Sequence, residues 1–233
     1  MKVIELKKTV TASNDRDADR LRKELTQSGT VLINLMSAAG SGKTTLLKRI
    51  IRDLGSRISI GVAEADIDAR VDAEAIEAAG ARSIQAHTDG MCHMDAGMTW
   101  TALEEMGYAD LDLVFLENVG NLICPAEYDT GAQVNVMILS VPEGDDKPLK
   151  YPLMFRKSDA LVITKTDAMP WFSFDLEKCR ERALRLNPSL NIFPVSAKTG
   201  DGMDALENWI LEKTGRAGNP GKTESPVRSE NLG

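Results

Sequence analysis

Residues 37–45, with the sequence SAAGSGKTT, are the segment best suited to phosphate chemistry. They follow an apolar run and precede an amphipathic one, and a strand, a glycine-rich turn and a helix in that order form a phosphate-binding P-loop. The glycines would let backbone amides approach the phosphates, Lys43 would bridge the β- and γ-phosphates, and the Thr44 hydroxyl would bind Mg²⁺. One position departs from the G-x4-G-K-S/T pattern, because Ser37 stands where the first glycine is usual. The predicted nucleotide contacts in this loop are Gly40, Ser41, Gly42, Lys43, Thr44 and Thr45.

Two later segments indicate which base the site binds. TKTD at 164–167 and SAK at 196–198 resemble the two guanine-recognition loops of GTPases, which are normally NKxD and SAK. Asp167 can accept hydrogen bonds from N1–H and the 2-amino group of guanine, whereas adenine offers neither donor on that edge. Thr164 replaces the usual asparagine, which we expect to weaken one tie within the pocket. We therefore predict GTP and GDP as ligands, bound by Lys165, Asp167, Ser196, Ala197 and Lys198.

The sequence LENVG at 116–120 resembles the DxxG switch of GTPases, with Glu117 in place of the aspartate. Glu117 should hold Mg²⁺ through water, and Gly120 can present its amide to the γ-phosphate. Asp66, after the second predicted strand, is a candidate for orienting water or Mg²⁺. Two weaker candidates, for which a solvated acidic turn is the simpler interpretation, are Asp68 and Asp72.

The hydrolytic machinery is incomplete. Asn121, and not a glutamine, follows Gly120. No arginine finger is recognisable in the chain, and such a residue can contribute ~10³–10⁵ in rate. We therefore predict slow intrinsic GTP hydrolysis, with Lys43, Asp66 and Glu117 as the catalytic residues.

A second kind of chemistry is indicated by Cys92 and His93, which are adjacent in a chain with three cysteines and two histidines. Together with Cys124, they offer thiolate and imidazole ligands that suit Ni(II) or Zn(II). One chain supplies only three ligands, and adjacent residues point in different directions, so a site shared at a dimer interface would resolve both problems. The alternative is that the cysteines are small apolar residues. Cys179 fits that alternative, because it falls on an apolar helical stripe.

The segments GMCHMDA, ENVGNLICP and SVPEGDDKPLKYPLMF closely resemble the HypB family of hydrogenase-maturation GTPases, and the resemblance extends over about residues 30–213. It implies a SIMIBI-class GTPase that forms a homodimer with nucleotide and helps to insert nickel into NiFe-hydrogenase. It also implies Cys92, His93 and Cys124 as nickel or zinc ligands, and a HypA-like nickel donor and the hydrogenase large-subunit precursor as partners. The family commonly has asparagine where this chain has His87, which we interpret as a strand-end histidine in preference to a ligand.

Two other functions stay open. The related urease-accessory GTPases carry Cys-Pro-His, whereas the cysteine and histidine here are adjacent. In a metal-independent regulatory GTPase, the cysteines would be incidental. For the predicted dimer, Lys147 or Lys150, on an expected loop, is a candidate to reach a neighbouring subunit's nucleotide or acidic loop.

Composition excludes several other classes. The 233 residues carry a formal net charge of −7, which argues against a nucleic-acid partner. No apolar run approaches the ~18 residues that a membrane span requires. Three cysteines without regular spacing are not a disulfide framework, so we expect a cytoplasmic protein.

Short apolar runs alternate with amphipathic segments along the chain. This alternation predicts an α/β fold of the P-loop NTPase type, with a doubly wound, mostly parallel sheet and helices on both faces. Strands are expected at 30–36, 57–63, 82–87, 111–117, 134–141, 160–165 and 191–196. Helices are expected at 15–28, 44–54, 72–79, 98–106, 175–187 and 203–213. We predict an N-terminal segment with a helix at 1–28, a GTPase domain with an embedded metal site at 29–213, and a disordered tail at 214–233.

Overall fold

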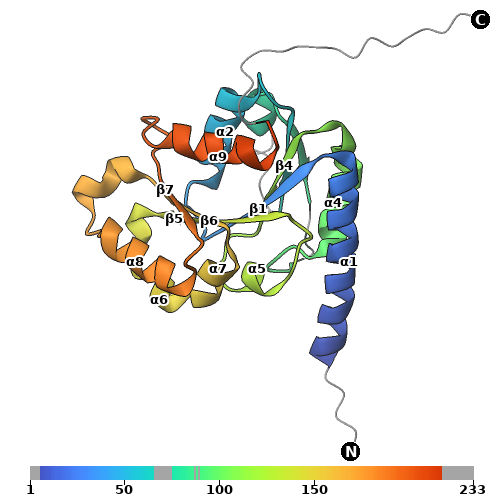
Figure 1. Ribbon diagram of the computed structural model, residues 1–233, viewed down its shortest axis with the longest axis horizontal. Helices are drawn as coiled ribbons and strands as arrows, with labels where there is room; N and C mark the ends of the chain where they lie inside the picture. Colours follow the sequence, from blue (N-terminus) through green and yellow to red (C-terminus); the bar gives the residue numbers. More distant parts are fainter. Residues whose placement is uncertain (1–5, 66–74, 87, 89, 217–233) are drawn as a thin grey trace, which may run out of the picture.

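A seven-stranded, all-parallel sheet forms the centre of the molecule (Figure 1). The computed structural model describes residues 6–65, 75–86, 88 and 90–216. The strand order is β3-β2-β4-β1-β5-β6-β7. The strands are β1 (Val31–Ser37), β2 (Ile60–Glu64), β3 (Arg82–Gln85), β4 (Leu113–Glu117), β5 (Val134–Ser140), β6 (Ala160–Thr164) and β7 (Asn191–Pro194). Because β1 lies between β4 and β5, the chain reverses its winding direction at the carboxyl end of β1, where ligands bind in such sheets.

Helices cover both faces of this sheet. In Figure 1, α2 and α9 lie on one face and α1 and α4 on the other. The α-helices with described bounds are α1 (Leu6–Ser28), α2 (Lys43–Leu54), α4 (Ala96–Met106), α5 (Cys124–Glu127), α6 (Lys147–Lys150), α7 (Pro152–Lys157), α8 (Leu176–Leu186) and α9 (Met203–Lys213). Short 3₁₀ turns lie at Tyr108–Asp110, Val141–Glu143 and Thr166–Trp171. None of the helices in the described ranges is long and apolar enough to cross a membrane.

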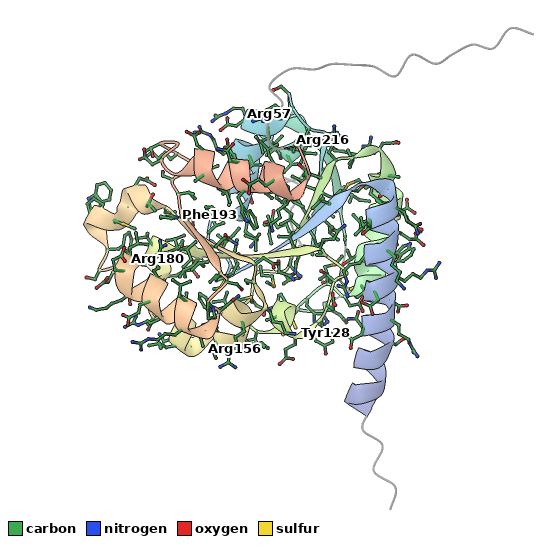
Figure 2. The ribbon with its side chains drawn as sticks, in the orientation of Figure 1. Arg57, Tyr128, Arg156, Arg180, Phe193 and Arg216 are labelled. Atoms are coloured by element: carbon green, nitrogen blue, oxygen red, sulfur yellow. The ribbon has the colours of Figure 1, made fainter. Side chains whose placement is uncertain are left out.

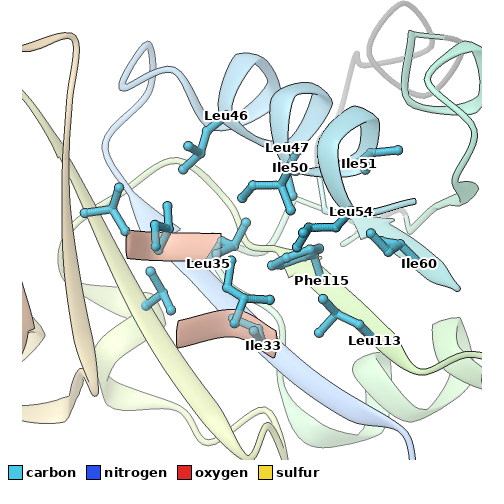
Figure 3. Close-up of a cluster of buried hydrophobic side chains, with 14 of the residues drawn as sticks. Ile33, Leu35, Leu46, Leu47, Ile50, Ile51, Leu54, Ile60, Leu113 and Phe115 are labelled. Carbon is cyan, nitrogen blue, oxygen red and sulfur yellow. The ribbon is translucent and has the colours of Figure 1, made fainter. Parts of the chain in front are cut away.

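The alternation of side chains along β1 divides the core between the two faces. Ile33 and Leu35 join the cluster formed with α2 and α9, part of which Figure 3 shows. Leu32 points to the other face, where it is buried with Leu21 and Leu25 of α1. Both faces of the strand are covered, which explains why its sequence is apolar nearly throughout.

All seven predicted strands and the doubly wound topology are confirmed. The first helix is longer than expected, because it begins at Leu6 and not near residue 15. The β-branched residues before Asn14 show no helical spacing of apolar side chains, so the sequence did not predict this extension. Of the helix expected at 72–79, residues 75–78 are helical and 72–74 lie outside the described residues. Most of the expected tail, residues 217–233, lies outside them too.

Three short helices, α5, α6 and α7, were not predicted. Each has proline at its first or second position, which is a helix-start signal. A helix of four to six residues is too short to show a helical period of apolar residues, so the sequence did not predict it. The prediction that Lys147 and Lys150 lie on a loop is therefore wrong. Both are bonded within their own chain, Lys147 Nζ to the Glu143 carbonyl oxygen at 2.6 Å and Lys150 Nζ to Asp146 Oδ2 at 2.6 Å.

Candidate nucleotide and metal sites

The P-loop leaves β1 at Ser37 and enters α2 at Lys43. Gly40 and Gly42 have φ of 71° and 92°, a region that favours glycine, and Gly42 is the residue that precedes the helix. The apolar face of α2 fixes the helix on the sheet, so its N-terminal N–H groups are directed at the end of β1. This is the geometry of an anion site at a helix N-terminus.

A cavity of about 540 Å³ opens at this position. It brings together nine of the residues predicted from the sequence, which are Gly40, Ser41, Gly42, Lys43, Thr44, Thr45, Glu117, Gly120 and Lys165. Sequence reasoning missed two lining residues, Ala39 and Val119. Their positions inside the two motifs were the only available signal, because neither side chain carries chemistry of its own.

The serine that departs from the P-loop pattern holds the polar side chains of the loop together. Lys43 Nζ donates to Ser37 Oγ at 2.9 Å, and Ser41 Oγ donates to the same oxygen at 2.7 Å. Ser37 is fully buried. Lys43 Nζ also lies 4.0 Å from Glu117 Oε1. Ser37 therefore keeps Lys43 in the cavity, close to the carboxylate predicted to bind Mg²⁺.

The TKTD segment is tied directly to the P-loop. Thr164 Oγ1 donates to the Ser41 carbonyl oxygen at 2.7 Å, and Lys165 Nζ donates to the Gly40 carbonyl oxygen at 2.8 Å. Thr164 thus forms a tie to the P-loop despite replacing asparagine. Lys165 has φ of 59°, and it is the one non-glycine residue in the described ranges with positive φ. This strained conformation directs its side chain across the loop.

The SAK segment joins the TKTD segment beside β6 and β7. Ser196 Oγ donates to Asp167 Oδ1 at 2.7 Å, and Thr166 N donates to the Val195 carbonyl oxygen at 3.2 Å. Ser196 is fully buried, whereas Lys198 is exposed. Asp167 and the three SAK residues do not line the phosphate cavity, whereas Lys165 does, so Lys165 is the predicted base contact that lies at the phosphate end of the site.

Gly120 lies against the P-loop. A Cβ atom at this position would be 3.1 Å from both Cα and N of Ala39, so only glycine fits without a shift of backbone. The loop after β4 is consequently held within reach of the phosphate cavity. Asp66, Asp68, Asp72 and His87 lie outside the described residues.

Two of the predicted metal ligands meet at the surface. Cys92 Sγ lies 2.7 Å from Cys124 Sγ, although the residues are 32 positions apart in sequence. Cys92 is exposed and Cys124 is half-buried. The hydrogen bond with Cys92 raises the pKa of the Cys124 thiol, with burial as the second cause. Cys179, by contrast, is fully buried in the core as predicted, and burial raises its pKa to about 12.

The His93 side chain lies inside the protein, whereas the neighbouring Cys92 is exposed. His93 is 6% exposed, and its ring stacks on Tyr128 with centroids 3.7 Å apart and planes 13° apart. Burial lowers the pKa of His93, which favours the neutral imidazole that binds metals. Its Nδ1 lies 3.8 Å from Cys92 Sγ, and Nε2 has no hydrogen-bond partner among the described residues.

Asn14 of α1 supports both loops that carry these ligands. Its Oδ1 accepts from the Ala96 N–H, at the start of α4, and its Nδ2 donates to the Asp129 carbonyl oxygen, both at 2.9 Å. Arg22 adds an ion pair with Asp129 at 2.8 Å. Figure 2 shows Tyr128, the stacking partner of His93, between α5 and α1. Nothing local in the sequence indicated that Asn14 has this role.

Comparison with known proteins places the chain in a family. A family model described as CobW/HypB/UreG, nucleotide-binding domain, matches residues 30–194. The hydrogenase maturation factor HypB of Rhizobium leguminosarum bv. viciae is 43% identical over 209 residues, which cover 90% of this chain and 70% of that protein. The chain belongs to the HypB family of hydrogenase maturation factors. HypB of Escherichia coli strain K12 is 40% identical over 209 residues, which cover 90% of this chain and 72% of that protein.

Solved HypB structures agree with this assignment. HypB from Archaeoglobus fulgidus superposes with a TM-score of 0.82 at 37% identity, covering 87% of this chain and 99% of that one. HypB from Helicobacter pylori in complex with nickel gives a TM-score of 0.81 at 35% identity, covering 90% and 99%. The signal recognition particle receptor FtsY from Elizabethkingia anophelis, at 12% identity and a TM-score of 0.53, covering 86% and 72%, shares only the fold of these P-loop GTPases.

The HypB assignment raises the question of which side chains surround the exposed thiol pair of Cys92 and Cys124. Within the described ranges, no group of three or more His, Cys, Asp or Glu side chains is arranged to hold a metal ion. Two sulfurs and one nearby imidazole are present, and two exposed apolar side chains, Met91 and Ile123, neighbour the cysteines in sequence. Cys92, His93 and Cys124, the predicted ligands, are thus not arranged as a complete metal site in the described part of one chain.

Proposed function

We propose that this HypB-family protein is a GTP-hydrolysing metallochaperone that helps to insert nickel into NiFe-hydrogenase. One observation carries the proposal: the Cys92 and Cys124 sulfurs lie 2.7 Å apart. Cys124, the first residue of α5, comes four residues after Gly120, which lines the phosphate cavity. Soft thiolates beside an imidazole suit nickel, with zinc as a competing ion. Nickel is here the cargo, and GTP supplies the signal to hold or release it.

The nucleotide pocket supports the GTPase half. Asp167 would bind the guanine edge, Lys165 would cover the base, and Lys43 would leave Ser37 to bind the β- and γ-phosphates. The Thr44 hydroxyl and the Glu117 carboxylate are hard oxygen donors lining one cavity, a set that fits Mg²⁺, with Asp66 as a third candidate. Bound Mg²⁺ would neutralise phosphate charge that develops during hydrolysis.

Slow intrinsic hydrolysis is supported by Asn121. The residue stands where a glutamine would orient the attacking water, and its side chain is already bonded to backbone groups of Cys92 and Cys124. A slow rate suits a protein that changes state once for each delivery. A homodimer would complete the metal site with ligands from a second chain, and Met91 and Ile123 would lie near that contact. The proposed partners are a HypA-like nickel donor and the hydrogenase large-subunit precursor, in the cytoplasm.

Metal titration and light scattering test the proposal in the full chain with GDP, with a slowly hydrolysed GTP analogue and without nucleotide. We expect nickel affinity and the dimer fraction to depend on the nucleotide. Cys92→Ala and Cys124→Ala should each abolish the high-affinity site and retain GTP binding. Cys179→Ala is the matched control, because this buried thiol should not affect nickel. Equal nickel affinity in all three nucleotide states would contradict the coupling.

Urease is a second candidate client. A relative from Helicobacter hepaticus, 39% identical over 216 residues, is described as a hydrogenase/urease maturation factor HypB. Co-expression with a NiFe-hydrogenase precursor or with urease subunits, followed by assay of each enzyme's nickel content, distinguishes the two clients.

A further inference from the structure

Asn121 joins the two loops that carry the thiols. Its Nδ2 donates to the Cys92 carbonyl oxygen. Its Oδ1 accepts from the backbone N–H groups of Ile123 and Cys124, both at 2.9 Å. An asparagine amide carries two donor hydrogens and an acceptor oxygen with two lone pairs, so a single side chain can make all three bonds. Asn121 therefore holds the Cys92 backbone and the Cys124 backbone at a fixed separation.

The backbone of Asn121 is in turn fixed at the phosphate cavity. Gly120, the preceding residue, lies so close to Ala39 of the P-loop that a Cβ atom would not fit without a shift. The Asn121 N–H donates to the Val119 carbonyl oxygen at 2.8 Å, which makes this turn compact. Any displacement of Gly120 must consequently displace Asn121 and the bonds that it makes.

Asn118 provides a contrasting connection inside the protein. Its Oδ1 accepts from the Met94 N–H at 3.1 Å, and its Nδ2 donates to Asn34 Oδ1 at 3.1 Å. Asn34 Nδ2 donates to Asn135 Oδ1 at 3.0 Å, so the chain of amides crosses from β4 to β1 and β5. Asn118 and Asn34 are each 1% exposed. The segment just after His93 is thus anchored to the sheet, whereas exposed Cys92 is held through half-buried Asn121.

We propose that Asn121 is a positioning residue that sets the distance between the Cys92 and Cys124 sulfurs and transmits movement of Gly120 to that distance. The inference rests on the proposed function, which assigns γ-phosphate contact to Gly120 and metal binding to the thiols. The Nδ2 donor is the essential part of the side chain. Oδ1 alone would only cap the first turn of α5, a role that many polar residues fill.

Two neutral substitutions separate positioning from capping. Asn121→Ser keeps an oxygen that can accept from N–H groups two or three residues later, but its side chain is too short to reach the Cys92 carbonyl. Asn121→Ala removes both functions. Positioning predicts that the serine variant behaves like the alanine variant, whereas capping predicts that it behaves like wild type. The serine variant also decides the question if the alanine variant does not fold. Asn191→Ala, which removes an exposed asparagine bond to the Asp159 carbonyl oxygen, is the matched control.

The first measurement needs no metal. In metal-free full chain, diamide takes up the two thiol hydrogens with their electrons as the Cys92–Cys124 disulfide forms, and mass spectrometry of the peptides gives the rate. We expect this rate to differ between GDP and a slowly hydrolysed GTP analogue in wild type. In Asn121→Ser it should fall about fivefold, the effect of one lost hydrogen bond, and should no longer depend on nucleotide. Asn191→Ala should match wild type.

Nickel titration of the same proteins separates failure of this inference from failure of the proposed function. If wild type binds nickel, and the oxidation rate and nickel affinity of Asn121→Ser and Asn121→Ala equal those of wild type, the inference is overturned and the proposed function stands. If the variants form the disulfide more slowly but wild type binds no nickel, the positioning role is supported and the metal role is rejected. A wild-type oxidation rate that is equal in both nucleotide states, or a nucleotide dependence that persists in Asn121→Ser, would overturn the transmission of movement.

Discussion

The polar side chains of the nucleotide pocket bond to one another across several elements, whereas the segments that carry Cys92 and Cys124 are joined through their backbones by the side chain of Asn121. In the pocket, Lys43 and Ser41 both bond to Ser37, and Thr164 adds a tie from β6. At the thiol pair, the sulfurs are at the surface and the imidazole of His93 is buried behind them. The pocket is preorganised within one chain, whereas the proposed metal site at the thiol pair would need further ligands to be complete.

This difference indicates a division of labour. A preformed phosphate site binds its ligand without a large ordering cost, because the P-loop amides are already directed at it. A site with few ligands and exposed sulfurs can gain or lose a metal with small movements, since the metal–sulfur bond of about 2.3 Å tolerates little displacement. Under the proposed function, the first property would keep the nucleotide bound and the second would allow nickel to be released.

The largest effect should come from Asp167→Asn, which tests whether the pocket is specific for guanine. Loss of the carboxylate removes two charge-assisted hydrogen bonds to N1–H and the 2-amino group, so GTP affinity should fall ~100-fold. The new amide can donate to O2 of xanthine, so affinity for xanthosine triphosphate should rise. Competition with labelled GDP measures both, with the exposed Asp204→Asn as control. Nickel affinity without nucleotide should stay unchanged, and a parallel loss of nickel binding would contradict the separation of the sites.

A smaller effect, about tenfold on nickel affinity, is expected for His93→Phe. Phenylalanine keeps an aromatic ring for stacking on Tyr128 but removes both nitrogens that can bind metal. Tyr128→Phe, which retains the stack, is the matched control and should bind nickel like wild type. Isothermal titration with nickel, and separately with GDP, measures the result. Unchanged nickel affinity in His93→Phe would make His93 a core residue and reduce the site to the two thiols.

The smallest effect concerns pH and the nucleotide half of the molecule. Burial, followed by the charge and hydrogen bond of Asp53, raises the pKa of Glu207 on α9 from 4.5 to about 7. The folded state thus binds a proton that the unfolded state has released, so this group's contribution to stability falls as pH rises from about 4.5 to 7 and is constant above. Arg49, near both residues, also lies beside Gly200 of the loop that follows SAK.

Glu207→Gln should therefore be more stable than wild type at pH 8 and similar at pH 5. Because Glu207 is half-buried and solvent screens its neighbours, we expect a gain of about 1 kcal/mol in the free energy of unfolding. Urea unfolding at both pH values measures it. Glu212→Gln, an exposed change on the same helix, is the control. Equal stability of Glu207→Gln and wild type at pH 8 would show that Glu207 is ionised without cost.

The sequence was most informative where chemistry is local. The P-loop, TKTD and SAK motifs are each contained in a short stretch of sequence. Apolar runs covered on both faces predicted the central strands, whereas the edge strands β3 and β7 are only partly buried. The contacts of Asn14, Asn118 and Asn121 were not predictable, because each joins segments that are far apart in sequence and asparagine has many roles. The family resemblance suggested the Cys92–Cys124 pairing, but periodicity and spacing alone did not.

The role of α1 bears on where the chain can be divided. A boundary between residues 28 and 29 looks natural in the sequence, yet Leu21 and Leu25 are fully buried on the sheet. Asn14 also bonds to the start of α4 at Ala96 and to Asp129, which follows α5. A shortened chain that begins at Gly29 would keep the entire P-loop motif but expose an apolar face and release the loop contacts at Ala96 and Asp129. The first helix is thus packed and hydrogen-bonded as part of the same unit as the sequence motifs, on the side of the molecule that carries Cys92 and Cys124.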